Sequence, residues 1–262
     1  MPGERITVDT QADGGAVGRA ILAAAALLTR LPIDRRGSVG PADVARGVVV
    51  FPVVGAAVGA SAAAVAWLLG HVFPPVVAAV GAVAAELLLS GGLHLDGLAD
   101  TFDGYGGDTR ERALEIMRDH SIGVYGAAAI AVDLLWKTAI VAALIERPGG
   151  LWIVIAAGAV SRAAAGVLGT VMAYARPPGG TGSVLGEHGR PAWAACAAFI
   201  GLMIAVASSG VRGLIGTVAA AAAAGAWAWR CRRRLGGMTG DTLGAGVEMT
   251  ELVVLLVGVA LK

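Results

Sequence analysis

Charged and aromatic residues are both scarce in this chain of 262 residues, at 15% and 5% of the sequence. Hydrophobic residues make up 56%, and the mean hydropathy is +0.74. So little charge excludes an ordinary soluble domain, in which about 25% of the residues are charged. The 40 glycines suit helices that approach one another closely in lipid. The sequence therefore predicts an all-α, polytopic integral membrane helical bundle.

Cysteine is almost absent as well. Cys196 and Cys231 lack both the spacing of a metal site and the framework of an extracellular disulfide protein. The formal net charge of +1 argues against nucleic-acid binding. The one dense basic run, residues 230–234, directly follows an apolar segment, which is typical of an anchor that fixes membrane topology.

Membrane crossing requires about 20 apolar residues in a helix. Seven segments meet or approach that length: 47–70, 75–95, 123–145, 151–173, 192–210, 213–229 and 247–261. The run Ala20–Leu28 is too short to span unaided, so we expect an interfacial or partly inserted helix there. We interpret residues 1–15 as a cytoplasmic N-terminal tail and 16–262 as a single integral membrane domain.

Arginine is unevenly distributed among the loops. Most arginines fall in four segments that alternate with arginine-poor ones; these four are 29–46, 96–122, 174–190 and 230–244. By the positive-inside rule, these four segments face the cytoplasm. A site at the cytoplasmic surface of the cell membrane is the expected consequence, because the loop aspartates collect there.

Three of those aspartates, Asp96, Asp100 and Asp103, stand in the stretch "GGLHLDGLADTFDGYGG". Their i, i+4 and i+7 spacing predicts one helical face if the helix ending near Leu95 continues for two turns. Two such charges about 6 Å apart repel by about 3 kcal/mol at an effective dielectric of 20. A bound divalent cation would relieve that repulsion, and an oxygen-only ligand set suits Mg²⁺ together with substrate phosphates.

A plainer reading of the triad is a solvated helix end. Gly97 and Gly104 count against it, because both lower helix propensity where a solvated end would gain from alanine. His94 is predicted to point away from the acidic face. An interfacial histidine with a single hydrogen bond explains it as well as a role in substrate binding does.

Two further segments carry candidate residues. Residues 108–119 predict a short amphipathic surface helix that ends at Arg118 and Asp119. From residue 235 a glycine-rich turn leads into a helix with Asp241 or Thr242 as its N-cap. Glu248 lies seven residues after Asp241, almost on the same helical face.

Charge within the predicted spans is costly and functional by default, which makes candidates of Glu86, Asp133, Lys137 and Arg162. Asp133 and Lys137 have i, i+4 spacing and can neutralise each other, which favours a structural role. Arg162 has no local partner. It is predicted to contact a phosphate or an acid on another helix.

Several motifs together resemble the cobalamin synthase family, the adenosylcobinamide-GDP ribazoletransferases. They are "TRLPI", "RGVVVFPVVG", "GGLHLDGLADTFDG", "LEIMRDHSIGVYG", "AVSR" and "LGGMTGDTLGAGVE". The resemblance implies a Mg²⁺-dependent membrane transferase that joins adenosylcobinamide-GDP to alpha-ribazole or its 5'-phosphate and releases GMP. It also implies membrane lipid as surroundings, and leaves a homo-oligomer or contact with other corrinoid-pathway enzymes open.

Site residues follow from the matching motifs. The resemblance implies Asp96, Asp100, Asp103 and Asp241 as catalytic residues and metal ligands, with Asp103 as ligand or general base. Substrate contacts are expected from a second set: Arg46, His94, Arg118, Asp119, Arg162, Thr239 and Glu248.

Two alternatives stay open at this point. A CDP-alcohol phosphotransferase also has a motif that begins Asp-Gly-x-x-Ala, but Asp100 stands here where that pattern has arginine. A transporter would account for Glu86, Asp133 and Arg162 within spans. Transporters, however, usually place their substrate sites near the bilayer midplane, whereas the densest polar residues here lie at one surface.

Overall fold

The computed structural model describes residues 10–33, 38–119, 121–177 and 181–261, and every regular element in these ranges is a helix. This confirms the all-α prediction. The elements are α1 (Thr10–Leu28), α2 (Pro41–Gly47), the 3₁₀ helix η1 (Val48–Val50), α3 (Phe51–Gly70), α4 (Pro75–Ser90), α5 (Leu93–Gly104), α6 (Arg110–Ile116), α7 (Val124–Ile145), α8 (Trp152–Val171), α9 (Thr181–His188), α10 (Pro191–Leu235) and α11 (Gly240–Ala260).

Five helices in these ranges are long and apolar enough to cross a membrane: Pro41–Gly70, α7, α8, α10 and α11. A sixth span results if α4 and α5 together form one broken crossing. Two expected segments, 192–210 and 213–229, both belong to α10. The expected final span, 247–261, lies in α11, but it is not short, because the helix already begins at Gly240.

The break in α10 is at Gly210, whose backbone is not helical (φ 57°, ψ −133°). The two limbs fold back on each other there. Gly213 of the second limb packs so closely on Ala205 of the first that a Cβ on Gly213 would collide with the Ala205 carbonyl. Both limbs line one apolar cavity of about 300 Å³ against α8. The two expected segments therefore exist as a helical hairpin.

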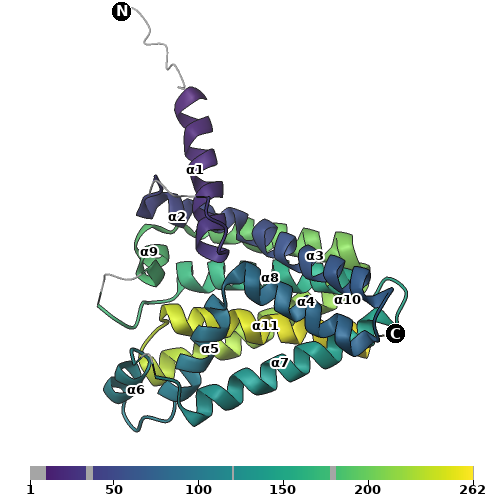
Figure 1. Cartoon of the computed structure of the whole chain (residues 1–262). Coiled ribbons are helices and arrows are strands. Elements are labelled where there is room, and N and C mark those ends of the chain that lie inside the picture. Colours follow the sequence, from purple (N-terminus) through teal and green to yellow (C-terminus); the bar gives the residue numbers. More distant parts are fainter. Residues whose placement is uncertain (1–9, 34–37, 120, 178–180, 262) are drawn as a thin grey trace, which may run out of the picture.

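Helix α8 lies in the middle of the bundle and packs on α3, α10 and α11 (Figure 1). Its backbone touches that of α3 where Gly158 meets Gly55, since a Cβ on either residue would collide with the carbonyl of the other. Small residues of this kind allow helices to pack closely without a hydrophobic driving force between them. The central helix is thus held by direct backbone approach.

A bend of 90° separates α4 from α5. Gly91 and Gly92 form it, with φ values of 64° and 69° in the left-handed region that glycine adopts without strain. The expectation that one helix continues past Leu95 is therefore wrong. Asp96, Asp100 and Asp103 nevertheless share a single helix, α5.

The short helices α2, α5, α6 and α9 gather at one end of the bundle, on the left in Figure 1. We call it the aspartate end, because Asp96, Asp100 and Asp241 lie there. Arg110 of α6 ties two of its loops together by donating to the carbonyls of Leu235 (2.7 Å) and Ala175 (3.0 Å). The four arginine-rich segments thus lie at one end, as expected.

Helix α1 contacts α2 and α3 beside the aspartate end. Arg19 forms an exposed ion pair with Asp43 of α2 at 3.3 Å. The apolar stretch of α1, Gly15–Leu28, is shorter than a membrane span. Of the expected N-terminal tail, residues 1–9 lie outside the described residues, and the tail's last residues belong to α1.

Candidate active site

Helix α5 and the start of α11 touch at backbone level. A Cβ on Gly97 would lie 2.7 Å from the carbonyl oxygen of Asp241 and 3.1 Å from its Cα. This approach brings Asp96 and Asp100, which flank Gly97 on α5, beside Asp241. Asp100 interacts electrostatically with four charged neighbours: Asp96, Asp241, Arg176 and Asp103. The structure therefore assembles the carboxylates of two predicted motifs into one group.

Arg176 completes this group, although no sequence pattern singles it out. Its guanidinium donates to Asp241 Oδ2 at 2.7 Å and to the carbonyl of Met117 at 3.4 Å, and its buried Nε has no hydrogen-bond partner among the described residues. The segment after α8 is held in place because Ala175 N–H donates to Met238 O at 2.7 Å. A cation thus stands among the aspartates.

Helix α11 begins with a capping box formed by Thr239 and Thr242. Thr239 is the N-cap and accepts from the N–H of Thr242 at 3.2 Å, while the Thr242 hydroxyl accepts from Thr239 N–H at 2.7 Å. The predicted N-cap, Asp241 or Thr242, is therefore wrong. Asp241 instead occupies the first turn, where the helix dipole stabilises a carboxylate.

Trp227 of α10 secures the same turn from behind. Its indole N–H donates to the carbonyl of Thr242 at 2.8 Å, and its ring meets Tyr105 edge to face. Burial raises the pKa of Tyr105, so the phenol stays protonated; it lies 3.6 Å from the sulfur of Cys231. These contacts fix the ends of α5, α10 and α11 relative to one another.

Asp103 faces a different neighbour. Its two oxygens accept from the backbone N–H groups of Gly123 (2.7 Å) and Gly126 (2.8 Å) at the start of α7. In this structure Asp103 therefore caps α7. Among the described residues, no three His, Cys, Asp or Glu side chains converge on a common metal position. The remaining carboxylates fit Mg²⁺ in its usual mode, with one or two protein carboxylates and substrate phosphates as ligands.

The other predicted substrate contacts near this end are more peripheral. Arg118 and Asp119 follow α6 and are exposed. They adjoin Met117, whose carbonyl accepts from Arg176. Arg46 lies on α2, with its guanidinium 5.9 Å from the ring of Trp193. All three border the aspartate end, while Thr239 is fully buried and serves as the cap of α11.

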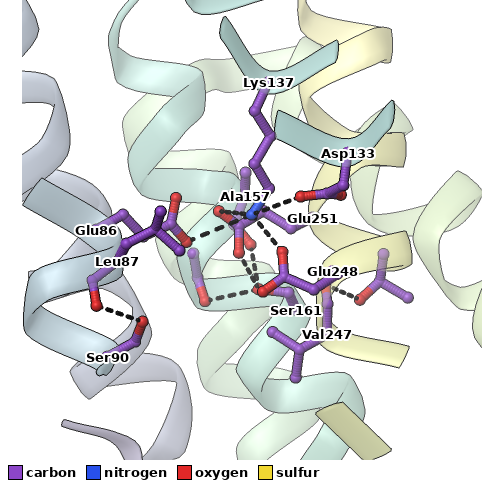
Figure 2. Close-up of polar contacts among 12 residues, drawn as sticks. Glu86, Leu87, Ser90, Asp133, Lys137, Ala157, Ser161, Val247, Glu248 and Glu251 are labelled. Atoms are coloured by element: carbon purple, nitrogen blue, oxygen red, sulfur yellow. Dashed lines mark hydrogen bonds and ion pairs between the residues drawn. The ribbon is translucent and has the colours of Figure 1, made fainter. Parts of the chain in front are cut away.

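A second charged group is buried inside the bundle, and Figure 2 shows Lys137 at its centre. The ammonium pairs with Glu248 and lies 3.7 to 3.8 Å from three further carboxylates, those of Glu86, Asp133 and Glu251. The predicted Asp133–Lys137 pair is thus confirmed. Glu248, predicted to contact substrate, is instead occupied by Lys137.

Arg162 belongs to the same buried network. It pairs with Glu251 and, at 3.1 Å, with Glu86, and it donates to the hydroxyl of Ser161 at 3.0 Å. Of the two partners expected for Arg162, the structure therefore supplies acids on other helices. Helices α4, α7, α8 and α11 meet in this network.

A cavity of about 180 Å³ lies at the aspartate end. Asp96 and Asp241 line it together with apolar residues of α1, α3 and α9 and with His94. His94 is 5% exposed, and no described residue is a hydrogen-bond partner of its Nδ1 atom. His94 was predicted to point away from the acidic face; its side chain is buried while Asp96 is exposed, but both residues line this cavity.

Fold and site together define a helical membrane protein with a carboxylate and arginine group at one end of its bundle. The family model for cobalamin-5-phosphate synthase matches residues 20–259, so the chain belongs to this family. This confirms the resemblance carried by the sequence motifs. The comparison with solved structures gives no match.

Curated relatives agree with the family. A Klebsiella pneumoniae subsp. pneumoniae protein named adenosylcobinamide-GDP ribazoletransferase is 38% identical over 242 residues, which cover 91% of this chain and 98% of that protein. An Escherichia coli protein of the same name is 36% identical over 233 residues, or 87% of this chain and 94% of that protein.

Proposed function

We propose that this protein is an adenosylcobinamide-GDP ribazoletransferase. A ribose hydroxyl of alpha-ribazole, or of its 5'-phosphate, attacks the phosphorus that carries cobinamide. The new P–O bond forms as the P–O bond to the GMP moiety breaks, and GMP departs with the bridging oxygen and its electron pair. The hydroxyl proton passes to a carboxylate of the site. Adenosylcobalamin or its phosphate is the other product.

The observation that carries this proposal is the contact of Gly97 with the backbone of Asp241. It brings carboxylates from two separate motifs side by side, with Arg176 next to Asp241. Transfer of a phosphoryl group depends mainly on positioning and on stabilising negative charge. A group of aspartates open to solvent, next to an arginine and a helix N-terminus, can supply both.

Individual roles follow from exposure and partners. Mg²⁺ would be held by one or two of three carboxylates: those of Asp96, which is exposed, of Asp100, which is half-buried, and of Asp241. The bound cation would neutralise charge on the pyrophosphate and on departing GMP. Arg176 and the N–H groups at the start of α11 contact the pyrophosphate. Arg118 and Arg46 are further candidates for that contact.

Location is part of the proposal. The aspartate end faces the cytoplasm of a cell membrane, since it carries the arginine-rich segments. Both substrates would then reach the site from the cytoplasm, while lipid surrounds α3, α4, α7 and α10.

The test uses the purified full chain in nanodiscs with adenosylcobinamide-GDP, alpha-ribazole and Mg²⁺, and measures GMP release. Asp96→Asn and Asp100→Asn should each lower turnover by about 10²- to 10³-fold, because each removes stabilisation of transition-state charge. EDTA should abolish turnover. Glu115→Gln is the matched control, because Glu115 is an exposed acid of the same end that pairs only with Arg112 among the contacts described.

Two results would overturn the proposal. The first is near-normal GMP release by both aspartate variants in saturating Mg²⁺. The second is release of CMP from CDP-diacylglycerol without any GMP from the corrinoid substrate, which would favour a CDP-alcohol phosphotransferase. Unchanged thermal unfolding of the variants is required for either comparison.

A further inference from the structure

A groove of about 340 Å³ lies at the aspartate end, on the side of α9. One wall is the segment that follows α8, which contributes Tyr174 and Arg176, and the other is α9, which contributes Glu187. Arg176 also donates to Asp241 at 2.7 Å. The groove therefore leads directly to the carboxylates of the proposed active site.

The wall that follows α8 is fixed by backbone hydrogen bonds. Met238 N–H donates to the carbonyl of Ala173 at 2.8 Å, and Ala175 N–H donates to that of Met238 at 2.7 Å. Tyr174 stands between these two bonds. Its ring packs on the first turn of α9, since a Cβ on Gly182 would lie 3.0 Å from Tyr174 Cε2. An aromatic ring is thus held in the groove by contacts on both sides.

Glu187 belongs to the face of α9 that lines the groove. Ser183, Gly186 and Glu187 all line it, and their i, i+3 and i+4 spacing puts them on one side of the helix. Glu187 is exposed and pairs with no base among the described residues. Its carboxylate can therefore accept hydrogen bonds from a ligand in the groove.

The three side chains match the parts of a guanosine nucleotide. A base can stack on an aromatic ring such as that of Tyr174, and an arginine can bind a phosphate. An ionised carboxylate only accepts hydrogen bonds. Guanine offers it two adjacent donors, N1–H and the 2-amino group, whereas adenine has an acceptor nitrogen at position 1. The groove therefore favours guanine over adenine.

We propose that this groove binds the guanosine part of adenosylcobinamide-GDP, which leaves as GMP. The guanine stacks on Tyr174, its N1–H and 2-amino group donate to Glu187, and its phosphate lies at Arg176. That arrangement places the pyrophosphate beside Asp241, where the proposed function requires it. The inference rests on that proposed function and names the subsite for the leaving nucleotide.

The first test compares two nucleotides that differ by one donor, because inosine 5'-monophosphate is GMP without the 2-amino group. Equilibrium dialysis with each labelled nucleotide and Mg²⁺ uses the full chain in nanodiscs. The wild type should bind GMP about tenfold more tightly, since the 2-amino group donates to a charged acceptor. Glu187→Ala should reduce this preference to within twofold. A merely structural Glu187 would affect both nucleotides alike and leave the preference intact.

Glu115→Ala is the matched control for Glu187→Ala. Glu115 is also an exposed acid on a short helix of the aspartate end, but it lies outside the groove. This variant should keep the tenfold preference for GMP.

A second pair of variants tests the stacking. Tyr174→Leu should weaken the binding of both nucleotides equally, by about tenfold, because the base loses its aromatic partner and no hydrogen bond. Tyr174→Phe keeps the ring and should bind both within twofold of the wild type. Thermal unfolding accompanies these measurements, since Tyr174 packs on Gly182. If Tyr174→Leu does not fold, the Glu187 comparison decides.

Three results would overturn the inference: a wild type that does not bind GMP, a wild type that binds both nucleotides equally, and a Glu187→Ala protein with the full preference for GMP. A preference that depends on Glu187, without GMP release from adenosylcobinamide-GDP, would contradict the proposed function and leave this subsite standing. GMP release by a protein whose preference does not depend on Glu187 would do the reverse.

Discussion

Lys137 holds together carboxylates from three helices, α4, α7 and α11. Four acids, Glu86, Asp133, Glu248 and Glu251, lie within ion-pair distance of its ammonium. Among the described residues, Arg162 is the only other base that pairs with these acids, through Glu86 and Glu251. The buried network therefore has more acids than bases, and its stability depends on each cation.

Unequal effects on stability are therefore expected from substituting a base and an acid of this network. Lys137→Met should lower the free energy of unfolding by about 3–5 kcal/mol, because it leaves buried carboxylates without a partner. Asp133→Asn should change the free energy of unfolding by less than about 1 kcal/mol, since it removes one negative charge from a network with excess acid, and Asp133 Oδ2 has no hydrogen bond to any described residue.

Thermal unfolding in detergent, followed by circular dichroism, measures both. Two results would contradict the conclusion that the network has more acids than bases and depends on each cation. One is a Lys137→Met protein as stable as the wild type, and the other is an Asp133→Asn protein destabilised as strongly as Lys137→Met.

Sequence spacing reveals only local partners. The pair of Asp133 and Lys137 was predictable because four residues separate them on one helix. Glu248 lies 111 residues from Lys137, and Asp241 lies 65 residues from Arg176. Only tertiary packing makes such pairs, so Arg176 gave no sign of its place beside Asp241.

At the scale of elements, the crossing of α5 and α11 creates the site. Gly97→Ala should separate the two helices, because its Cβ would lie 2.7 Å from the carbonyl of Asp241. The shift would move Asp241 away from Asp96 and Asp100, and displacement of about 1 Å can cost about 10²-fold in turnover. We expect kcat to fall by that order.

The measurement is GMP release beside a thermal unfolding curve. Gly225→Ala is the control, since it adds the same methyl group in open space and improves helix propensity. Full activity in Gly97→Ala, or equal losses in both variants, would show that the backbone contact does not position the aspartates.

Element positions were largely predictable, whereas only one of the two bends was. Hydropathy and length locate α7 and α8 to within a few residues of 123–145 and 151–173, and they separate the segments 192–210 and 213–229 at the break near Gly210. They cannot locate the 90° turn at Gly91 and Gly92, because apolar character continues close to that turn. Those positive-φ glycines decide which residues reach the aspartate end.

For the whole molecule, polarity differs between the two ends of the bundle. The aspartate end holds the arginine-rich segments, which Arg110 and Arg234 connect through backbone carbonyls. The opposite end is formed by the short loops around Gly149 and Ser209, which together line a small pocket. An asymmetric arginine distribution of this kind orients a protein with the arginine-rich end in the cytoplasm.

Accessibility of single cysteines should reveal this orientation. In a Cys196→Ala background, in which Cys231 is buried, Glu146→Cys places a thiol at the end of α7 and Glu115→Cys places one on α6; both parent residues are exposed. A membrane-impermeant maleimide added to right-side-out vesicles should label Glu146→Cys at once and Glu115→Cys only after permeabilisation. The reverse pattern would put the aspartate end outside, away from cytoplasmic substrates, and would contradict the proposed location of the reaction even if GMP release were intact in detergent.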